Sequence, residues 1–348
     1  MIIRFLLHSV LSGLLLSSSC QPSNPTFASG QKPLVSEPEM ASEQRPAATP
    51  RQQSAPSGNY ATQNVVLVVI DGVRYSDSWG DSTFSNIPHM ARELAPKGVF
   101  HPKFYNKGVT KTNPGHVALT TGNYQQIKNT GGELPQSPSV FHYYRQHTGA
   151  PATDAWVITS KDKLEILART TSTDAAAKFA PSTSSGNNGL NSGYRPDTTT
   201  IRIAKQVFSQ HKPKLVLINL REPDSEAHEG NWDGYIKAIK QSDRLVADLW
   251  KWLQKQPNYR NNTTLLITND HGRHLGDRFG DHGDGCEGCR HISLLMLGPD
   301  VAPGTVASKP RSQADVAATM AELLGIPLPK QDGEPMLELL TPPRPIGD

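Results

Sequence analysis

Short, uninterrupted runs of apolar and β-branched residues recur along the chain from residue 64 onwards. The first of them, NVVLVVIDG, ends in an Asp-Gly pair. Runs of this kind are typical of strands that are buried on both faces of a parallel sheet. We expect a strand in each of five such runs, at residues 64–72, 155–160, 214–220, 263–270 and 291–298.

Segments with helical periodicity lie between these runs. Residues 198–211 and 235–256 repeat apolar side chains at the three- and four-residue intervals of one helical face. A third segment, residues 313–325, ends in Gly325, which is suited to close a helix in the left-handed conformation. Strands that alternate with helices favour an α/β fold, a three-layer sandwich with a mostly parallel central sheet.

The first twenty residues, MIIRFLLHSVLSGLLLSSSC, follow a different pattern. One positive charge precedes an apolar run that is too short to remain as a membrane-spanning helix, and small residues then lead to Cys20. We interpret residues 1–20 as a signal peptide, and Ser17–Cys20 resembles the lipobox of bacterial lipoproteins. We therefore expect an exported lipoprotein in the periplasm or at the cell surface, held at the membrane by a lipid on Cys20. Gln21 favours the outer membrane, and plain secretion is the alternative.

Residues 21–62 contain many prolines and are otherwise rich in Ser, Gln and Ala. Too few large apolar groups are present to offset the entropy that is lost when a backbone is ordered. We predict a disordered tether here, ahead of one catalytic domain at residues 63–348. The net charge of +3 over 348 residues gives no reason to propose a nucleic acid as partner.

Acidic and histidine side chains follow three of the predicted strands. Asp71 ends the first run, Asp224 lies just beyond the third, and Asp270 and His271 follow the fourth. In mostly parallel sheets, ligands bind beyond the carboxyl ends of the strands. Each residue alone could be an ordinary turn residue. Together they point to a metal site, because carboxylate and imidazole groups are ligands that zinc prefers.

The stretch KGVTKTNPGHVALTTG places Thr112 where a helix should begin. A helix start attracts anions through its unpaired N–H groups, and a hydroxyl placed there could attack one. The alternative is that Thr112 or Asn113 only caps the helix, with Pro114 in its first turn.

Four motifs occur in an order that resembles the alkaline phosphatase superfamily, and most closely its nucleotide pyrophosphatase/phosphodiesterase branch. They are VVIDGVR (Val68–Arg74), TKTNPGHVALTTG (Thr110–Gly122), EPDSEAH (Glu222–His228) and TNDHGR (Thr268–Arg273). The resemblance extends over residues 63–328. It implies an alkaline phosphatase-like fold and two divalent metal ions, which are zinc in most members, with manganese as the alternative.

The resemblance also implies which residues bind the two ions. One ion would be bound by Asp71, Thr112, Asp270 and His271, and the other by Asp224, His228 and a third histidine. His291 is preferred as the third histidine, because it directly precedes an apolar strand and a Gly-Pro pair, as the last ligand of the superfamily does. His282 is the rival and His274 a further candidate.

The same resemblance implies that Thr112 is the nucleophile. Its oxygen would attack phosphorus, expel the leaving group and form a phosphothreonine that water then hydrolyses, while N–H groups at the helix start hold the charged oxygens. Asn129 resembles the asparagine that binds a phosphoryl oxygen in this branch, although the loop before it is shorter here. We expect a small phosphate ester as substrate, either a diester or a monoester.

An insertion near residues 161–197 is expected to cap the site. It contains Lys161, Lys163 and Arg169, any of which could reach the third phosphoryl oxygen of a monoester. A sulfatase-like activity is disfavoured, because sulfatases require Cys or Ser at the position of Thr112. A non-catalytic binding module on the same fold is the other alternative, but nearly all of the expected ligands and the threonine are present in order.

Cys286 and Cys289 form the motif CEGC, one helical turn apart. In an oxidising compartment we expect them to form a disulfide that stiffens the loop before His291. Metal binding and redox chemistry are the alternatives for a Cys-x-x-Cys motif.

Overall fold

The computed structural model describes residues 59–172, 178–329 and 331–341 of the chain. The predicted signal peptide, Cys20 and nearly all of the predicted tether lie outside these residues. In the part of the chain that is described, no helix combines the length and the apolar character that a membrane span requires.

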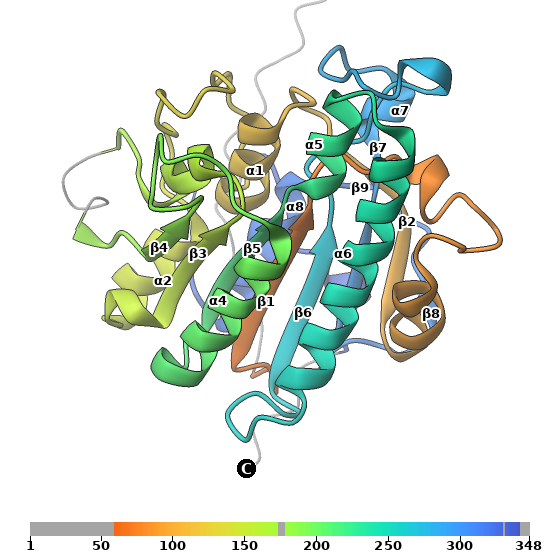
Figure 1. Cartoon of the computed structure of the whole chain (residues 1–348). Helices are drawn as coiled ribbons and strands as arrows, with labels where there is room; N and C mark the ends of the chain where they lie inside the picture. Colours follow the sequence, from red (N-terminus) through yellow and green to blue (C-terminus); the bar gives the residue numbers. More distant parts are fainter. Residues whose placement is uncertain (1–58, 173–177, 330, 342–348) are drawn as a thin grey trace, which may run out of the picture. The chain divides into compact units, whose positions relative to one another are not determined.

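A mixed sheet of nine strands runs through the described residues (Figure 1). Its order is β4-β3-β5-β1-β6-β7-β2-β8, and β9 pairs with β2. The strands are β1 Asn64–Ile70, β2 Val99–Tyr105, β3 Ala155–Thr159, β4 Ser182–Ser185, β5 Leu215–Leu220, β6 Thr263–Thr268, β7 His291–Leu297, β8 Thr305–Val306 and β9 Arg311–Ser312. All five predicted strands are confirmed.

The centre of the sheet is parallel, as predicted. β1 pairs in parallel with β5 and β6, and β3 pairs in parallel with β4 and β5. β7 is antiparallel to both β6 and β2. The link from β6 to β7 contains only the short elements η6 and α7 rather than a crossover helix, so β7 returns beside β6 in the opposite direction.

Two layers of helices enclose the sheet. The α-helices are α1 Thr112–Thr121, α2 Val140–Thr148, α4 Asp197–His211, α5 Glu222–His228, α6 Trp232–Leu253, α7 Glu287–Arg290 and α8 Ala314–Leu324. The short 3-10 or π elements are η1 Tyr75–Asp77, η2 Met90–Leu94, η3 Ala95–Lys97, η4 Ala152–Asp154, η5 Asp162–Ala168, η6 Gly276–Arg278 and η7 Leu337–Leu339. Gly325 caps α8 with a φ of 65°, as predicted.

Alternation along β1 builds both halves of the core. Val65, Leu67 and Val69 lie in an apolar cluster with residues of α1, α2 and α8. Val66 and Val68 lie in a second cluster with residues of α4 and α6, which cover the front of the sheet in Figure 1. A strand buried on both faces needs a continuous apolar run, which is the pattern of residues 64–70.

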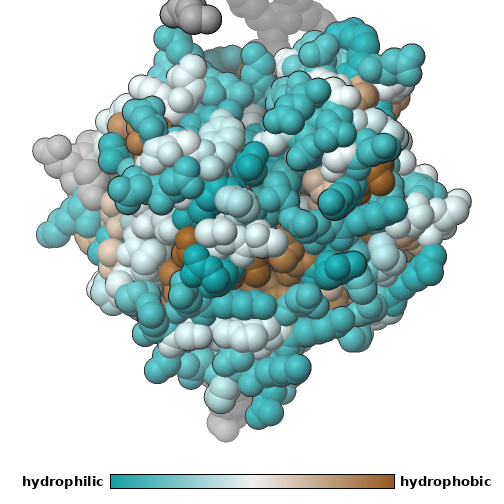
Figure 2. Space-filling view, viewed as in Figure 1, coloured by the Kyte–Doolittle hydropathy of each residue, from teal (hydrophilic) through white to brown (hydrophobic). Residues whose placement is uncertain are grey.

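A groove of about 550 Å³ opens between α4 and α6 on this front layer. Its walls combine apolar side chains such as Ile201, Leu245 and Trp252 with polar ones such as Lys205. Figure 2, which has the viewpoint of Figure 1, shows hydrophobic residues gathered between these two helices.

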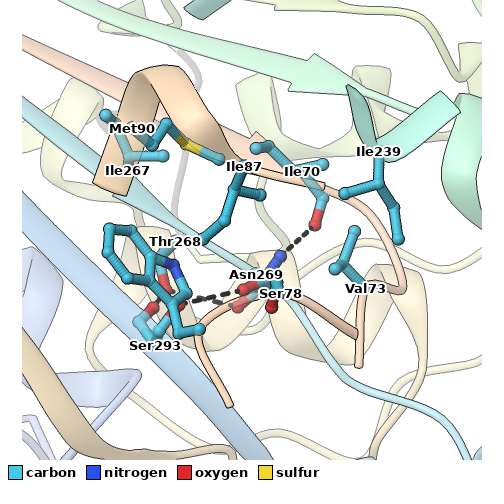
Figure 3. A pocket seen from close by; sticks show the side chains of 11 residues that line it. Ile70, Val73, Ser78, Ile87, Met90, Ile239, Ile267, Thr268, Asn269 and Ser293 are labelled. Carbon is cyan, nitrogen blue, oxygen red and sulfur yellow. Dashed lines mark hydrogen bonds between the residues drawn. The ribbon is translucent and has the colours of Figure 1, made fainter. Parts of the chain in front are cut away.

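Polar side chains tie the ends of β1, β6 and β7 together around a small cavity (Figure 3). Asn269 Nδ2 donates a hydrogen bond of 2.8 Å to the carbonyl of Ile70, and Thr268 Oγ1 donates one of 2.7 Å to the carbonyl of Ser293. The cavity, at about 20 Å³, has room for about one water molecule and is a packing void. These bonds hold Asp71 and Asp270, each the next residue along the chain, at one edge of the sheet.

Candidate active site with two metal-binding clusters

The first cluster of possible ligands is built by the ends of neighbouring strands. Asp71 directly follows β1, and its N–H donates to the carbonyl of Leu220 at 2.9 Å. Asp270 and His271 follow β6, the other neighbour of β1. Parallel strands in register therefore bring the three side chains to one point, as the sequence predicted.

The donor atoms of this first cluster lie close enough together to bind one cation between them. His271 Nε2 lies 3.5 Å from Asp71 Oδ1 and 3.5 Å from Asp270 Oδ2. All three side chains are fully buried, and these same three atoms have no hydrogen-bond partner among the described residues. Ligands of a tetrahedral zinc ion with bonds of about 2.0–2.1 Å lie about 3.3 Å apart. A divalent cation fits here, and it would satisfy three buried atoms that are otherwise costly.

The second cluster comes from α5 and from the loop between β6 and β7. Asp224 and His228 are four residues apart on α5 and so lie on one side of the helix. Asp224 Oδ1 is 3.4 Å from His228 Nε2 and 3.6 Å from His282 Nε2. The two histidine Nε2 atoms are 3.0 Å apart. This nearly equilateral triangle also has the dimensions of a zinc site.

The third histidine beside Asp224 and His228 is His282, and the preference for His291 is not supported by this geometry. His291 opens β7 opposite Tyr105 of β2. The ring stacks on Tyr75 and Tyr105, and Nε2 donates to the carbonyl of Pro102 at 2.7 Å. The ring of His291 therefore has stacking and hydrogen-bond partners that belong to neither cluster.

Two histidines are fixed in orientation by bonds from their other ring nitrogen. His282 Nδ1 donates to the carbonyl of Thr110 at 2.8 Å, and His271 Nδ1 donates to that of Gly272 at 2.9 Å. The two rings also stack with centroids 3.9 Å apart. Each Nε2 lone pair is thereby left for a ligand, the arrangement usual for metal-binding histidines. Burial lowers the pKa of both imidazoles, to about 2 for His282, which keeps them neutral.

Gly72 lets the two clusters approach each other. Its φ is +66°, which favours glycine, and a Cβ atom there would lie 2.6 Å from Asp224 Oδ1. Its N–H donates to Asp270 Oδ1 at 3.1 Å. The Asp-Gly pair of the first predicted strand therefore supplies a ligand and the space for a neighbouring one.

Thr112 is the first residue of α1. No side chain caps this helix, so the capping interpretation of Thr112 and Asn113 is not met. The hydroxyl of Thr112 is buried and accepts a hydrogen bond of 3.1 Å from Lys161 Nζ. That ammonium also lies 2.9 Å from Asp71 Oδ2 and 2.5 Å from Asp224 Oδ2, so it joins Thr112 to one carboxylate of each cluster.

The start of α1 offers few free N–H groups, contrary to the sequence-based expectation. Pro114 has none, the N–H of Gly115 donates to the carbonyl of Lys111, and that of Asn113 donates to Asn129 Oδ1. Charged oxygens of a substrate would therefore depend on side chains more than on the helix backbone.

Lys161, which the sequence offered only as a possible contact to a phosphoryl oxygen, instead bonds Thr112 and the two carboxylates. It follows β3 just as the aspartates follow their strands, and this shared position was the available signal. Burial alone would lower the pKa of Lys161, but Asp224 and Asp71 outweigh that effect and raise it. Lys161 is thus a permanent cation inside the site.

The two clusters differ in electrostatics. Burial, and then the charge of Asp270, raise the pKa of Asp71 well above its usual value. Burial would also raise the pKa of Asp224, but Lys161 and Arg273 hold it well below its usual value. Burial would raise the pKa of Asp270 too, but His271 and His116 hold it below its usual value. The uncompensated charge of the first cluster is therefore concentrated on Asp71, although Lys161 lies 2.9 Å from that carboxylate.

Three further buried residues position the ligands. Arg273 donates to the carboxylate of Asp224 and to the carbonyl of Gly280, which connects α5 to the loop before His282. Asn219 Nδ2 donates to Asp71 Oδ2 at 3.2 Å. His116 Nδ1 lies 2.9 Å from the carbonyl of Thr112 and 3.3 Å from Asp270 Oδ2. Arg273 stands in the TNDHGR motif, and His116 follows Thr112 by one helical turn.

A cleft of about 420 Å³ leads to Thr112. Its lining residues are Thr112, Asn129, Lys161, Lys163, Tyr194, Arg221, Asp224, Ser225, His228 and Glu229. Asn129 accepts from Asn113 through Oδ1, so the amide nitrogen is the donor that it can offer to a ligand.

The insertion near residues 161–197 contributes both to the sheet and to the cleft. It forms η5 and β4, which pairs with β3, and it supplies Lys161, Lys163 and Tyr194 to the cleft wall. Arg169 instead pairs with Glu165 at 3.1 Å and does not line the cleft.

Cys286 and Cys289 are thiols in the structure, so the predicted disulfide is not present. Their sulfur atoms are 3.2 Å apart, against about 2.05 Å for a disulfide bond. Cys286 directly precedes α7, and Cys289 lies within it. At this distance the Cys286 thiol donates a hydrogen bond to the sulfur of Cys289.

Comparison with known proteins places these motifs in context. The sequence model of a family described as type I phosphodiesterase / nucleotide pyrophosphatase matches residues 65–281. Sulfatase ppz1 of Metarhizium majus is 36% identical over 104 residues, which cover 29% of this chain and 24% of that protein. The chain spans only between 22% and 32% of the length of this and three further curated relatives.

Solved structures share the fold at low identity. An inactive threonine-to-alanine variant of murine ectonucleotide pyrophosphatase / phosphodiesterase 5 in complex with AMP superposes with a TM-score of 0.61 at 16% identity, over 80% of this chain and 100% of that one. Phosphonate monoester hydrolase SpPMH from Silicibacter pomeroyi gives 0.58 at 15% identity, over 82% of this chain and 78% of that one. These likenesses confirm the alkaline phosphatase-like α/β fold.

Proposed function

The chain belongs to the type I phosphodiesterase / nucleotide pyrophosphatase family of the alkaline phosphatase superfamily, and on this premise we propose that it is an exported phosphoric ester hydrolase that forms a phosphothreonine. The observation that carries the proposal is the position of Thr112. Its buried hydroxyl lines the cleft. Lys161 joins it to Asp71 of one three-donor cluster and to Asp224 of the other.

Two divalent ions, zinc or manganese, would be bound by the two clusters. Asp71, Asp270, His271 and the hydroxyl of Thr112 would hold one, and Asp224, His228 and His282 the other. When bound, such ions supply Lewis-acid stabilisation of phosphoryl oxygens and make a nearby hydroxyl group more acidic.

Thr112 is the nucleophile in this proposal. Its hydroxyl loses its proton to solvent, the oxygen attacks phosphorus as the bond to the leaving oxygen breaks, and the leaving oxygen takes up a proton from water. Lys161, 3.1 Å away, stabilises the negative charge on the threonine oxygen by a charge-assisted hydrogen bond. Water then attacks phosphorus, the bond to Thr112 breaks, and inorganic phosphate or a monoester leaves. Asn129 offers its amide nitrogen to a phosphoryl oxygen from the cleft wall.

The threonine also bears on the competing activities. In sulfatases the nucleophile is made by converting a Cys or Ser side chain to formylglycine. Threonine cannot be converted in this way, so we expect sulfate esters to be poor substrates. A non-catalytic binding module is disfavoured as well, because the two clusters touch through the stacked rings of His271 and His282. Lys161 joins the hydroxyl of Thr112 to a carboxylate of each cluster.

Monoester hydrolysis is a second candidate beside diester hydrolysis, and the cleft supports it. Lys163 lines the cleft with its Nζ 3.2 Å from the carbonyl of Asn129, and Arg221 lies in the same wall. These cations are additional to Lys161. They could bind the third, charged oxygen that a monoester carries and a diester lacks.

Export and lipidation remain part of the proposal through residues 1–20, which the structure does not describe. Metabolic labelling with a palmitate analogue should modify the wild-type chain in a bacterial host and leave Cys20→Ser unlabelled. Labelling of both chains, or of neither, would refute a lipid on Cys20.

The enzymatic proposal is tested with the purified chain after its metal has been removed. Zinc or manganese is restored, and cleavage of bis-nitrophenyl phosphate, nitrophenyl phosphate and nitrophenyl sulfate is compared. We expect metal-dependent cleavage of a phosphate ester and a covalent phosphoryl group on Thr112 in acid-quenched samples. Full activity of Thr112→Ala would refute the mechanism, and Thr121→Ala on the same helix is the control.

A further inference from the structure

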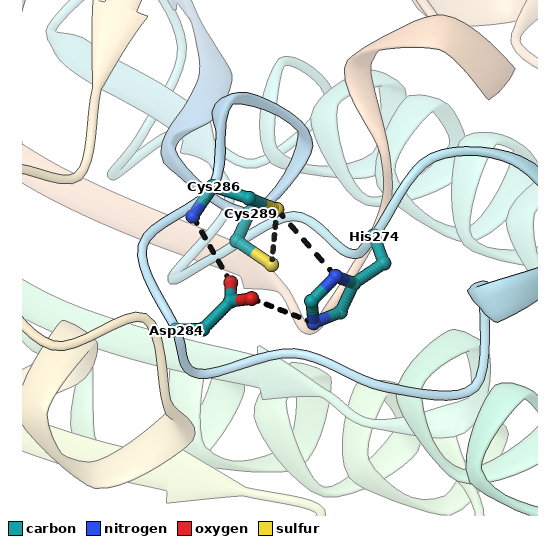
Figure 4. Close-up of side chains that lie close together, drawn as sticks. All are labelled: His274, Asp284, Cys286 and Cys289. Atoms are coloured by element: carbon teal, nitrogen blue, oxygen red, sulfur yellow. Dashed lines mark hydrogen bonds and ion pairs between the residues drawn. The ribbon is translucent and has the colours of Figure 1, made fainter. Parts of the chain in front are cut away.

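A third group of possible metal ligands lies in the loop between β6 and β7 (Figure 4). It consists of His274, Asp284, Cys286 and Cys289, and one donor atom from each lies within 4.8 Å of the others. None of the four has a role in the proposed hydrolysis. The inference below therefore goes beyond that function and does not depend on it.

The distances within this cluster are close to those of a metal site. The sulfur atoms of Cys286 and Cys289 are 3.2 Å apart, and Cys286 Sγ is 3.8 Å from His274 Nδ1. Asp284 Oδ2 contacts the other ring nitrogen of His274, Nε2, at 3.4 Å, so this distance is not one between two ligands of an ion bound at Nδ1. With zinc bonds of about 2.3 Å to sulfur and about 2.0–2.1 Å to nitrogen, tetrahedral geometry requires separations of about 3.8 Å and about 3.6 Å. Shifts of about half an ångström or less would give these two separations.

The surroundings of the cluster are those of a fixed site. Cys289 is fully buried and His274 is nearly so, while Asp284 closes the cluster from the exposed side. The backbone is already folded around the group, because the N–H of Cys286 donates to Asp284 Oδ1 at 3.0 Å and the N–H of Cys289 donates to the carbonyl of Cys286. Cys-x-x-Cys at the start of a short helix is a common zinc-binding arrangement.

We propose that His274, Asp284, Cys286 and Cys289 bind one zinc ion as a closed, structural site. Two thiolates select a soft or borderline metal over magnesium or calcium, and an imidazole with a carboxylate completes four ligands. Four protein ligands leave no open position for a substrate. The ion therefore has a structural role, unlike the ions of the two catalytic clusters.

The place of this site in the loop explains what the ion would hold. The N–H of Gly272 donates to the carbonyl of Cys289 at 2.8 Å, and the N–H of His274 donates to that of Asp281 at 3.1 Å. The ligands thus come from both ends of a loop that has little regular structure and that carries His282 in its middle. A bound ion would restrict this loop and keep His282 against His228.

Cobalt substitution tests the proposal on the full chain, kept reduced and stripped of metal. Cobalt bound by thiolates gives a charge-transfer band in the near ultraviolet, which the two sulfur-free clusters cannot give. We expect this band to saturate at one equivalent per chain. It should persist in Asp270→Asn and be lost in Cys286→Ser/Cys289→Ser, which should also contain one zinc fewer by elemental analysis.

Matched controls separate ligation from general damage to the loop. Glu287→Gln lies between the cysteines, and Asp277→Asn lies in the same loop; both side chains are exposed and outside the cluster, so the band should be unchanged. Asp284→Asn should weaken cobalt binding at least tenfold. The proposal is overturned if the reduced wild-type chain binds cobalt without this band. It is also overturned if the cysteines are found as a disulfide and the chain binds no metal there once that disulfide has been reduced. Either outcome holds whatever the variants do.

Discussion

The two clusters of possible metal ligands use the same kinds of side chain but differ in how the fold supports them. The inner cluster, Asp71, Asp270 and His271, comes entirely from strand ends in the middle of the sheet and is fully buried. The outer cluster depends on α5 and on a loop, and the side chain of His228 is 49% exposed. The pairing register of β1 and β6 fixes the positions of the inner ligands. The outer cluster forms only where the loop that carries His282 packs against α5.

This difference should govern how strongly each cluster binds metal. The inner cluster has three buried donor atoms without hydrogen-bond partners among the described residues. The cation beside it, Lys161, is shared with Asp224 of the outer cluster. In the outer cluster Arg273 and Lys161 already neutralise Asp224. We infer that the inner site binds its ion more tightly and that the outer site exchanges its ion more readily.

The largest effect is expected at Thr112, which Lys161 joins to both clusters. Thr112→Ala should reduce turnover on the order of 10⁴-fold or more, because it removes the nucleophile while leaving every other ligand in place. Metal content, measured on the same preparation by elemental analysis, should not fall by a full equivalent. A variant that loses both ions would show that the hydroxyl matters mainly for metal binding.

The next effect concerns the inner cluster alone. Asp270→Asn should remove one metal equivalent and lower turnover on the order of 10³-fold, because an amide oxygen cannot replace the charge of the carboxylate beside the ion. The thermal stabilisation that added zinc gives to the wild-type chain should shrink accordingly. Unchanged stabilisation would contradict the tighter affinity inferred for the inner site.

The outer cluster is tested by comparing two histidines. His282→Gln should weaken binding of the second ion by about 100-fold, since it removes one of three protein ligands. His291→Gln should leave metal content and turnover within about threefold and cost only about 1 kcal/mol of stability, through lost stacking on Tyr75 and Tyr105. Isothermal titration and thermal unfolding of both variants decide between them, and the reverse pattern would restore His291 as the ligand.

The smallest effect is a pH dependence that would distinguish monoesters from diesters. Burial, and then the charge of Lys161, lower the pKa of Lys163 to about 8. Lys163 is therefore charged below that pH and neutral above it. The kcat/KM for nitrophenyl phosphate should fall about tenfold as pH rises through 8, because a charged hydrogen bond to the third oxygen is lost.

The control for this pH dependence is the diester bis-nitrophenyl phosphate, for which the decline should be weaker. Lys163→Met should have low monoester activity and no decline near pH 8, whereas Lys163→Arg should stay active above it. An unchanged decline in Lys163→Met would assign the titration to another group.

The sheet was predictable because its central strands are buried on both faces. Residues 64–70 and 263–268 can only be apolar runs in such a position, and their alternation with helices leads to parallel order. β2, with the sequence VFHPKFY, and β4, with STSS, were missed. Both lack a continuous apolar run, and they are strands only because β7 and β3 offer them a partner.

The inner ligands were predictable from the sequence for the same reason, since strand ends in register must meet. The third outer histidine was not, because its position depends on contacts between distant segments. His282 is held by the carbonyl of Thr110 and by the ring of His271, neither of which the local sequence reveals. The sequence identified Lys161 only as a candidate contact to a phosphoryl oxygen and did not show which way its side chain points, because a lysine after a strand is usually solvated.

The missing side chain at Gly72 has a consequence for the distance between the two clusters. A single methyl group at this turn would press against the carboxylate of Asp224 and force α5 outward, away from the end of β1. The separation of Asp224 from Asp71 and Asp270 is therefore set by an atom that the chain omits. Any side chain there would displace Asp224 first and would leave the ligands at the strand ends in place.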